Sequence, residues 1–120
     1  MATENFQQPI LSTDLSFTIS VGANTSNEVD FIGTCLLALV TDANLTGTSF
    51  TFLSSDTKNG VYLPIHRMTD GLIITAVLAP SRRSATNPFD FTSARFLKIV
   101  SNVNQSGVDT NIGISNRQIA

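Results

Sequence analysis

Strict alternation of apolar and polar residues is the feature that most limits what this chain can fold into. At residues 15–21, Leu, Phe, Ile and Val fill every second position, with Ser and Thr between them. A period of two places the apolar side chains on one face of a strand, whereas a helix needs a period of about 3.6 residues. A period of two is also present at residues 48–53, where Phe50 and Phe52 share one face, and at residues 95–101, where Phe96, Lys98 and Val100 alternate with Leu97 and Ile99. The sequence therefore predicts several half-buried strands in place of a helical core.

Turn-forming residues divide the rest of the chain into further short elements. Residues 29–41 are almost continuously apolar, and Gly33 near the start predicts a bulge or a strand break. Asn59-Gly60 favours the positive φ values of a tight hairpin turn, and Asp70-Gly71 is a second turn signal. Because Pro64 has no N–H to donate, the strand before it should end there or lie at a sheet edge. Other expected elements are strands at residues 61–63, 72–78 and 111–115, a loop or short edge strand at 81–86, and a helical turn at 89–93.

About eight short strands and no convincing helix predict an all-β fold, either a β-sandwich or a jelly roll of antiparallel strands. With 120 residues the chain fits a single domain. We assign that domain to residues 15–120 and expect residues 1–14 to form an extended N-terminal arm. The arm has no periodicity, but Phe6 and Ile10 are suited to anchor it in a groove of a partner. An additional edge strand on the chain's own sheet is the alternative for this segment.

Charged residues are scarce, which limits the kinds of partner that this chain can bind. They make up 13% of the sequence, against about 25% in an average soluble domain, and the formal net charge is -2. Binding to phosphates needs clustered Lys and Arg, yet the only adjacent basic pair is Arg82-Arg83. We therefore expect no nucleic-acid partner, and we treat Arg82 and Arg83 as candidates for contacting an acidic patch on another protein.

Hydropathy and surface character predict the location of the chain and its state of assembly. No apolar run approaches the roughly 20 residues of a membrane-spanning helix, and residues 1–15 lack the pattern of a signal peptide. We therefore expect a soluble protein made in the cytoplasm, with no membrane partner. A weakly charged surface and open sheet edges favour packing against copies of the same chain. A homo-oligomer is expected, with a trimer as the first hypothesis.

Residues that could carry out catalysis or bind a metal or cofactor are few and isolated. Cys35 is the only cysteine, which excludes an intrachain disulfide, and the apolar run around it predicts a small buried side chain. His66 is the only histidine, and no nucleophile motif accompanies it. Asp56, Asp70 and Asp90 could supply the carboxylate pair of a glycosidase, but each lies beside turn residues, where Asp bonds to its own backbone. We predict no enzyme, no cofactor and no metal site.

Five segments follow one another in a recognisable order along most of the chain. They are Phe31-Ile32-Gly33, Leu45-Thr-Gly-Thr-Ser-Phe-Thr-Phe52, Gly60-Val-Tyr-Leu-Pro-Ile65, Asn87-Pro-Phe-Asp-Phe91 and Ala94-Arg-Phe-Leu-Lys-Ile-Val-Ser101. In this order and spacing they resemble a family of small virion structural proteins of tailed bacteriophages, the β-sandwich capsid decoration or cement proteins. The resemblance runs from Glu28 to the C-terminus. The chain departs from the pattern at Asp56-Thr-Lys-Asn-Gly60, where an Asp-Gly turn would follow Ser54-Ser55.

The resemblance implies a β-sandwich protein of the virion and identifies no catalytic residue. The expected function is that of a capsid decoration or cement protein, which binds the outside of the assembled head and strengthens contacts there. Its partners would be the major capsid protein or other virion proteins. A head-to-tail, tail or fibre-attachment component is the alternative within the virion, and a carbohydrate-binding module is the alternative outside it. The candidate partner-binding residues are Phe6, Ile10, Arg82 and Arg83.

Overall fold

The computed structural model describes residues 11–12, 15–31, 34–87, 90–91 and 94–118, and these residues form an all-β fold. Phe6 and Ile10 lie outside the described residues. Among the described residues there are ten strands and no α-helix. The strands are β1 (Leu11–Ser12), β2 (Ser16–Ile19), β3 (Val29–Asp30), β4 (Thr34–Thr41), β5 (Ser49–Ser55), β6 (Leu63–Pro64), β7 (Thr75–Val77), β8 (Arg83–Ala85), β9 (Phe96–Ser101) and β10 (Thr110–Gln118).

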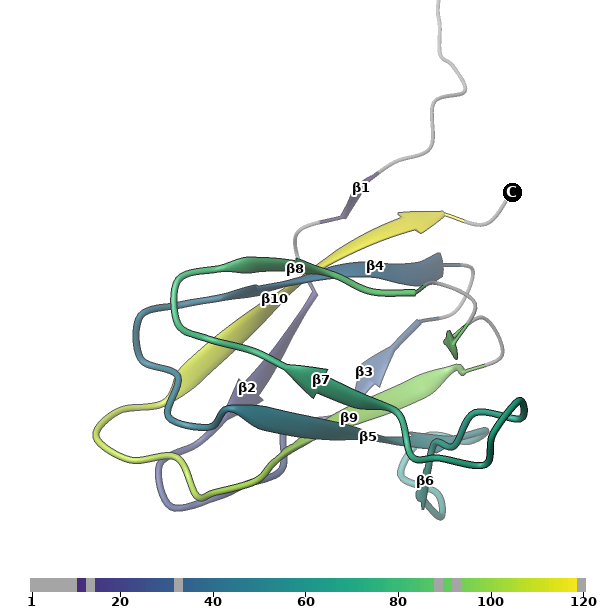
Figure 1. Ribbon diagram of the computed structural model, residues 1–120, viewed down its shortest axis with the longest axis horizontal. Coiled ribbons are helices and arrows are strands. Elements are labelled where there is room, and N and C mark those ends of the chain that lie inside the picture. The colour runs from purple at the N-terminus through teal and green to yellow at the C-terminus, as the bar shows by residue number, and fades with distance from the viewer. Residues whose placement is uncertain (1–10, 13–14, 32–33, 88–89, 92–93, 119–120) are drawn as a thin grey trace, which may run out of the picture.

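The strands form two antiparallel sheets that pack face to face (Figure 1). In one sheet, called the β10 sheet, the order is β1-β10-β4-β8, and β2 also pairs with β10. In the other, called the β9 sheet, the order is β3-β9-β5-β6, and β7 also pairs with β5. The predicted β-sandwich of antiparallel strands is confirmed.

The pairing of the strands is that of a jelly roll. Leaving aside β1 and β6, the first of the eight remaining strands pairs with the last (β2 with β10), and the second pairs with the seventh (β3 with β9). The third pairs with the sixth (β4 with β8), and the fourth pairs with the fifth (β5 with β7). One long hairpin that has been rolled over itself gives these four pairs, which is how a jelly roll divides its strands between two sheets.

The core lies between the sheets and is built from the apolar positions of the alternating segments. Phe17 of β2 and Phe50 of β5 are fully buried, and so is Ile99 of β9. The rings of Phe52 and Phe91 meet edge to face, with centroids 4.8 Å apart. The period of two therefore identified these strands, because alternate positions enter the core and most positions between them stay half-buried.

Three expected elements differ from the structure. The apolar run at residues 29–41 is divided between β3 and β4, which belong to different sheets, and Gly33, the expected bulge or break, lies outside the described residues. The strand expected at residues 72–78 is limited to β7, because the preceding residues belong to a projecting hairpin. The weak strand expected at residues 111–115 is the longest in the fold, and it pairs with both β2 and β4.

The turn at Asn59-Gly60 also differs in detail from the prediction. Asn59 has the expected positive φ of 55°, whereas Gly60 is not in the left-handed region. Gly60 is required for a different reason, since a Cβ there would lie 2.0 Å from Oγ1 of Thr57. The turn therefore needs glycine for space at its second position and tolerates Asn at its first.

The segment predicted as an N-terminal arm is described only in part. Leu11 and Ser12 form β1 and pair with Arg117 and Asn116 of β10. Residues 1–10 and 13–14 lie outside the described residues. The described part of the segment therefore adds a short strand to the β10 sheet.

The side chain of Gln105 joins several loops at one end of the sandwich, which we call the loop end. Gln105 is 3% exposed. Its Nε2 donates to the carbonyl oxygens of Asn44 (2.5 Å) and Val108 (3.0 Å), and its Oε1 accepts from the amide of Thr46 at 3.1 Å. Its backbone also bonds to Gly22 and Ala23, so one residue connects three chain segments.

Candidate interaction surface

An interrupted edge strand gives the sandwich its most prominent projection. β6 and β7 both pair antiparallel with β5, one beside Leu53 and Ser54 and the other beside residues 49–51. They are two parts of one edge strand, and residues 65–74 are inserted between them as a hairpin that we call the edge hairpin (Figure 1). The amide of Ile74 donates to the carbonyl of Ile65 at 3.0 Å, which closes the base of the hairpin.

The turn of the edge hairpin is fixed by hydrogen bonds and one ion pair. The amide of Arg67 donates to the carbonyl of Leu72 at 2.9 Å, and the amide of Leu72 donates to Oδ1 of Asp70 at 2.9 Å. Arg67 and Asp70 form an ion pair at 3.4 Å, and Gly71 supplies the positive φ of 72° that the turn needs. The Leu72 amide and the Arg67 guanidinium hold the pKa of Asp70 below its usual value. The predicted Asp70-Gly71 turn is confirmed.

This ordered turn presents two apolar side chains to solvent, Met68 and Leu72, which we call the apolar tip. Met68 is fully exposed and Leu72 is 59% exposed. Among the residues that the structure describes, six of the ten exposed large apolar side chains fall at residues 61–77, so the exposed apolar surface is concentrated on this stretch. Large exposed apolar patches can mark interaction sites, and Met is enriched in protein interfaces.

A hollow beside the edge hairpin gives the surface a concave flank. It has a volume of about 420 Å³ and lies between His66, Arg67 and Thr69 on one side and Asn87 and Asp90 on the other. The apolar tip and this hollow lie together on the edge hairpin, since Met68 also lines the hollow.

The residues that the sequence offered for chemistry lie around the edge hairpin and in one other turn. His66 and Asp90 line the same hollow, but Nδ1 of His66 lies 3.3 Å from the carbonyl oxygen of Pro64, and Asp70 is engaged in its turn. Asp56 is exposed in the turn after β5. The described residues contain no group of three or more His, Cys, Asp or Glu that could hold a metal. They also contain no helix long and apolar enough to cross a membrane.

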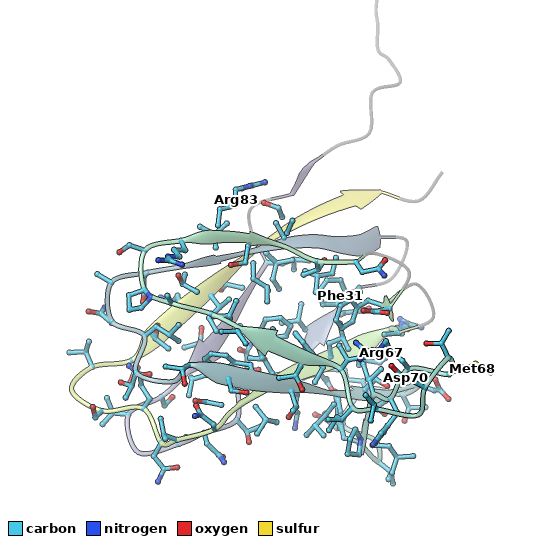
Figure 2. All side chains as sticks on the ribbon, viewed as in Figure 1. Phe31, Arg67, Met68, Asp70 and Arg83 are labelled. Carbon is cyan, nitrogen blue, oxygen red and sulfur yellow. The ribbon has the colours of Figure 1, made fainter. Side chains whose placement is uncertain are left out.

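Arg82 and Arg83 lie on the other sheet, away from the apolar tip. Their backbone is anchored to β4, because the amide of Arg82 donates to Oγ1 of Thr41 at 3.0 Å and Arg83 pairs with Val40. Both side chains are exposed, and within the part of the chain that the structure describes neither forms an ion pair. Figure 2 shows Arg83 above the β10 sheet and Met68 at the far end of the edge hairpin. The two surfaces are therefore separate.

A clamp that the sequence analysis did not identify holds the turn between β5 and β6. Oε2 of Glu28 accepts from the hydroxyl of Tyr62 and from the amide of Asn59, the latter at 2.8 Å. Lys98 lies over the ring of Tyr62, with Nζ 4.5 Å from its centroid. The Tyr62 hydroxyl and the Asn59 amide lower the pKa of Glu28, while burial and the Glu28 carboxylate raise the pKa of Tyr62. The partners come from separate strands and turns, so no local pattern signals them.

Comparison with known proteins supplies no relative for this chain. No model of a known protein family matches the sequence, and a search of curated proteins finds no match.

Proposed function

We propose that this protein is a non-catalytic structural component of a tailed-phage virion, and specifically a capsid decoration or cement protein bound to the outside of the head. The observation that carries the proposal is the edge hairpin, whose ordered turn holds Met68 and Leu72 in solvent. Its partners would be the major capsid protein or other virion proteins.

The apolar tip has the properties of an anchor that binds a partner surface with little loss of freedom. Its backbone is already fixed by the Arg67 and Asp70 contacts, so binding orders mainly the two apolar side chains. Arg67 and Asp70 offset each other's charge. The tip can therefore enter an apolar pocket on a capsid protein without carrying an unpaired charge into it.

The fold is compatible with the proposal, although it does not by itself select it. Jelly rolls form viral capsid domains and also lectins, and a fold alone does not imply a function. Sugar binding by stacking needs an exposed aromatic face. The six phenylalanines that the structure describes are buried, and Tyr62 is half-buried with Lys98 over its ring. The described aromatic residues thus favour the virion hypothesis over a carbohydrate-binding module.

Arg82 and Arg83 offer a second contact, suited to an acidic patch on the capsid. Their guanidinium groups are exposed above the β10 sheet, and Arg83 borders a hollow of about 290 Å³ that Val40 and Gly113 also line. Anchoring of an N-terminal arm through Phe6 and Ile10 stays a prediction, because both residues lie outside the described residues.

Binding to phage particles that lack this protein tests the proposal. We expect Met68→Gln and Leu72→Gln to weaken binding by about 2 kcal/mol or more each, which is about 30-fold in Kd, as for a buried interface anchor. Leu63→Gln is the matched control, because Leu63 is 65% exposed but lies in β6, outside the edge hairpin. Full binding by both tip variants, or an equal loss with the control, would contradict a role for the apolar tip.

A further inference from the structure

The edge strand β7 lacks the charges that protect other edges of the sandwich. Open strand edges expose unpaired backbone groups, and natural proteins guard them with charged residues or proline. β8 begins at Arg83, and Asp30 of β3 forms a 3.4 Å ion pair with Arg95. By contrast, no charged residue occurs between Gly71 and Ser81, the stretch that contains β7. This edge is therefore open to another strand.

The backbone of β7 leaves two residues with unpaired groups on its outer side. The amide of Leu78 donates to the carbonyl of Thr48 at 3.0 Å, and Ala76 pairs with Phe50. Because groups alternate along an antiparallel strand, Ala76 and Leu78 direct their backbone groups to β5, while Thr75 and Val77 direct theirs outward. No described residue bonds to these outward groups.

The side chains and the space beside β7 also suit an incoming strand. Val77 is 79% exposed and Ile73 is exposed, so the edge is apolar as well as unpaired. A hollow of about 240 Å³ lies between β7 and the edge strand β8 of the other sheet, with Val77 on one side and Ser84 on the other. The outer side of β7 is therefore accessible.

We propose that β7 pairs antiparallel with β7 of a second copy of this chain, about a two-fold axis at Ala76. In this register Thr75 lies opposite Val77 of the second copy, and the outward amides and carbonyls of the two residues form four hydrogen bonds. Ala76 lies opposite Ala76 of the second copy in a non-hydrogen-bonded pair. This agrees with the direction of its backbone groups, which point to β5. Ile73 lies opposite Ala79 of the second copy, so an exposed apolar residue is covered.

A second copy is the favoured partner because this edge does not repel itself. Two β8 edges brought together in the same way would place Arg83 close to Arg83, whereas two β7 edges meet without charge. The pairing joins the β9 sheets of two copies into one continuous sheet. It gives a dimer in place of the trimer expected from the sequence, and it does not depend on the virion proposal.

Sedimentation equilibrium over a range of concentrations tests the pairing, with Val77→Lys as the disrupting variant. A lysine at this edge should raise the dimer Kd at least about tenfold, because the new charges lie diagonally across the axis. The melting temperature measured at concentrations where the chain is monomeric should stay unchanged, because Val77 is exposed. Val61→Lys is the matched control, since Val61 is 82% exposed in the turn between β5 and β6. A chain that is monomeric up to about 1 mM, a trimer, or a dimer that Val77→Lys weakens no more than Val61→Lys does would overturn the proposal.

Disulfide cross-linking tests the register directly. In a Cys35→Ala background, chains carrying Thr75→Cys are mixed with chains carrying Val77→Cys and oxidised. The proposed register places these two positions opposite each other, at a Cα separation of about 5.5 Å that a disulfide can span. The mixture should therefore cross-link faster than either variant alone. Equal cross-linking by a single variant would show that the register is wrong.

Discussion

Replacing Gln105 measures how strongly the buried hydrogen bonds at the loop end hold the fold. Gln105→Ala leaves the carbonyls of Asn44 and Val108 and the amide of Thr46 without their partner. An unsatisfied buried group costs about 1–3 kcal/mol, and solvent can reach part of these exposed loops. We therefore expect a loss of about 2–4 kcal/mol in the free energy of unfolding, a large share of the roughly 5–15 kcal/mol of a typical domain.

Gln105→Glu should make the same site sensitive to pH. A carboxylate at position 105 would face the carbonyl oxygens of Asn44 and Val108, so repulsion and burial would raise its pKa above the ordinary value of about 4.3. A raised folded pKa means that the native state keeps a proton which the unfolded state has lost. Stability therefore falls as the pH rises from about 4.3 through the raised pKa, by about 1.4 kcal/mol for each unit of the shift.

Urea unfolding of wild type, Gln105→Ala and Gln105→Glu between about pH 4 and pH 8 gives these free energies. Asn104→Asp is the matched control, because it adds the same charge at the exposed neighbouring residue. The control should show no comparable loss of stability with rising pH. Wild-type stability in Gln105→Ala, or a pH profile of Gln105→Glu that follows the control, would refute the account of the loop end.

Two further predictions concern the Glu28 clamp and the approach of two chain segments at Gly47. The hydroxyl of Tyr62 and then the amide of Asn59 hold the pKa of Glu28 below its ordinary 4.5. The contribution of the Glu28 carboxylate to the stability of the fold is therefore complete above that pH and is lost as the pH falls through the folded pKa. Glu28→Gln should remove this part of the acid-induced loss of stability, measured as unfolding midpoints over a series of pH values. An acid profile identical to that of the wild type would contradict the role of the Glu28 clamp. Gly47→Ala should cost about 1–3 kcal/mol, because its Cβ would lie 2.0 Å from Oγ of Ser101. Ser101→Ala should recover part of that cost in a double-mutant cycle of unfolding free energies, whereas simple additivity would argue against the contact.

The strands that the sequence predicted best are those whose burial alternates locally. β2 follows the predicted alternation because Phe17 and Ile19 enter the core while the residues between them stay partly exposed. The length of β10 was underestimated, because the local sequence predicted a strand only at residues 111–115. Its apolar residues alternate with Asn111, Gly113 and Ser115, which are common in loops, and its position between β2 and β4 depends on partners far away in the sequence.

The candidate surface was only partly visible in the sequence. Arg82 and Arg83 were identified as an exposed pair from their adjacency, and the structure places both side chains in solvent. The edge hairpin was missed because Leu72 continues smoothly into the apolar run that ends in β7, so the sequence favoured one strand there. Only the pairing of β6 and β7 with the same strand shows that Leu72 and Met68 are held outside the sandwich.

Locating the chain in purified phage particles by cryo-electron microscopy tests the proposed function most directly. A capsid decoration protein predicts density for the sandwich at many symmetry-related sites on the outside of the head, with the edge hairpin, Met68 foremost, against the major capsid protein. A few copies at one vertex would instead support a head-to-tail or tail component. Particles that contain no copy of the chain would contradict the proposal that it is a virion protein.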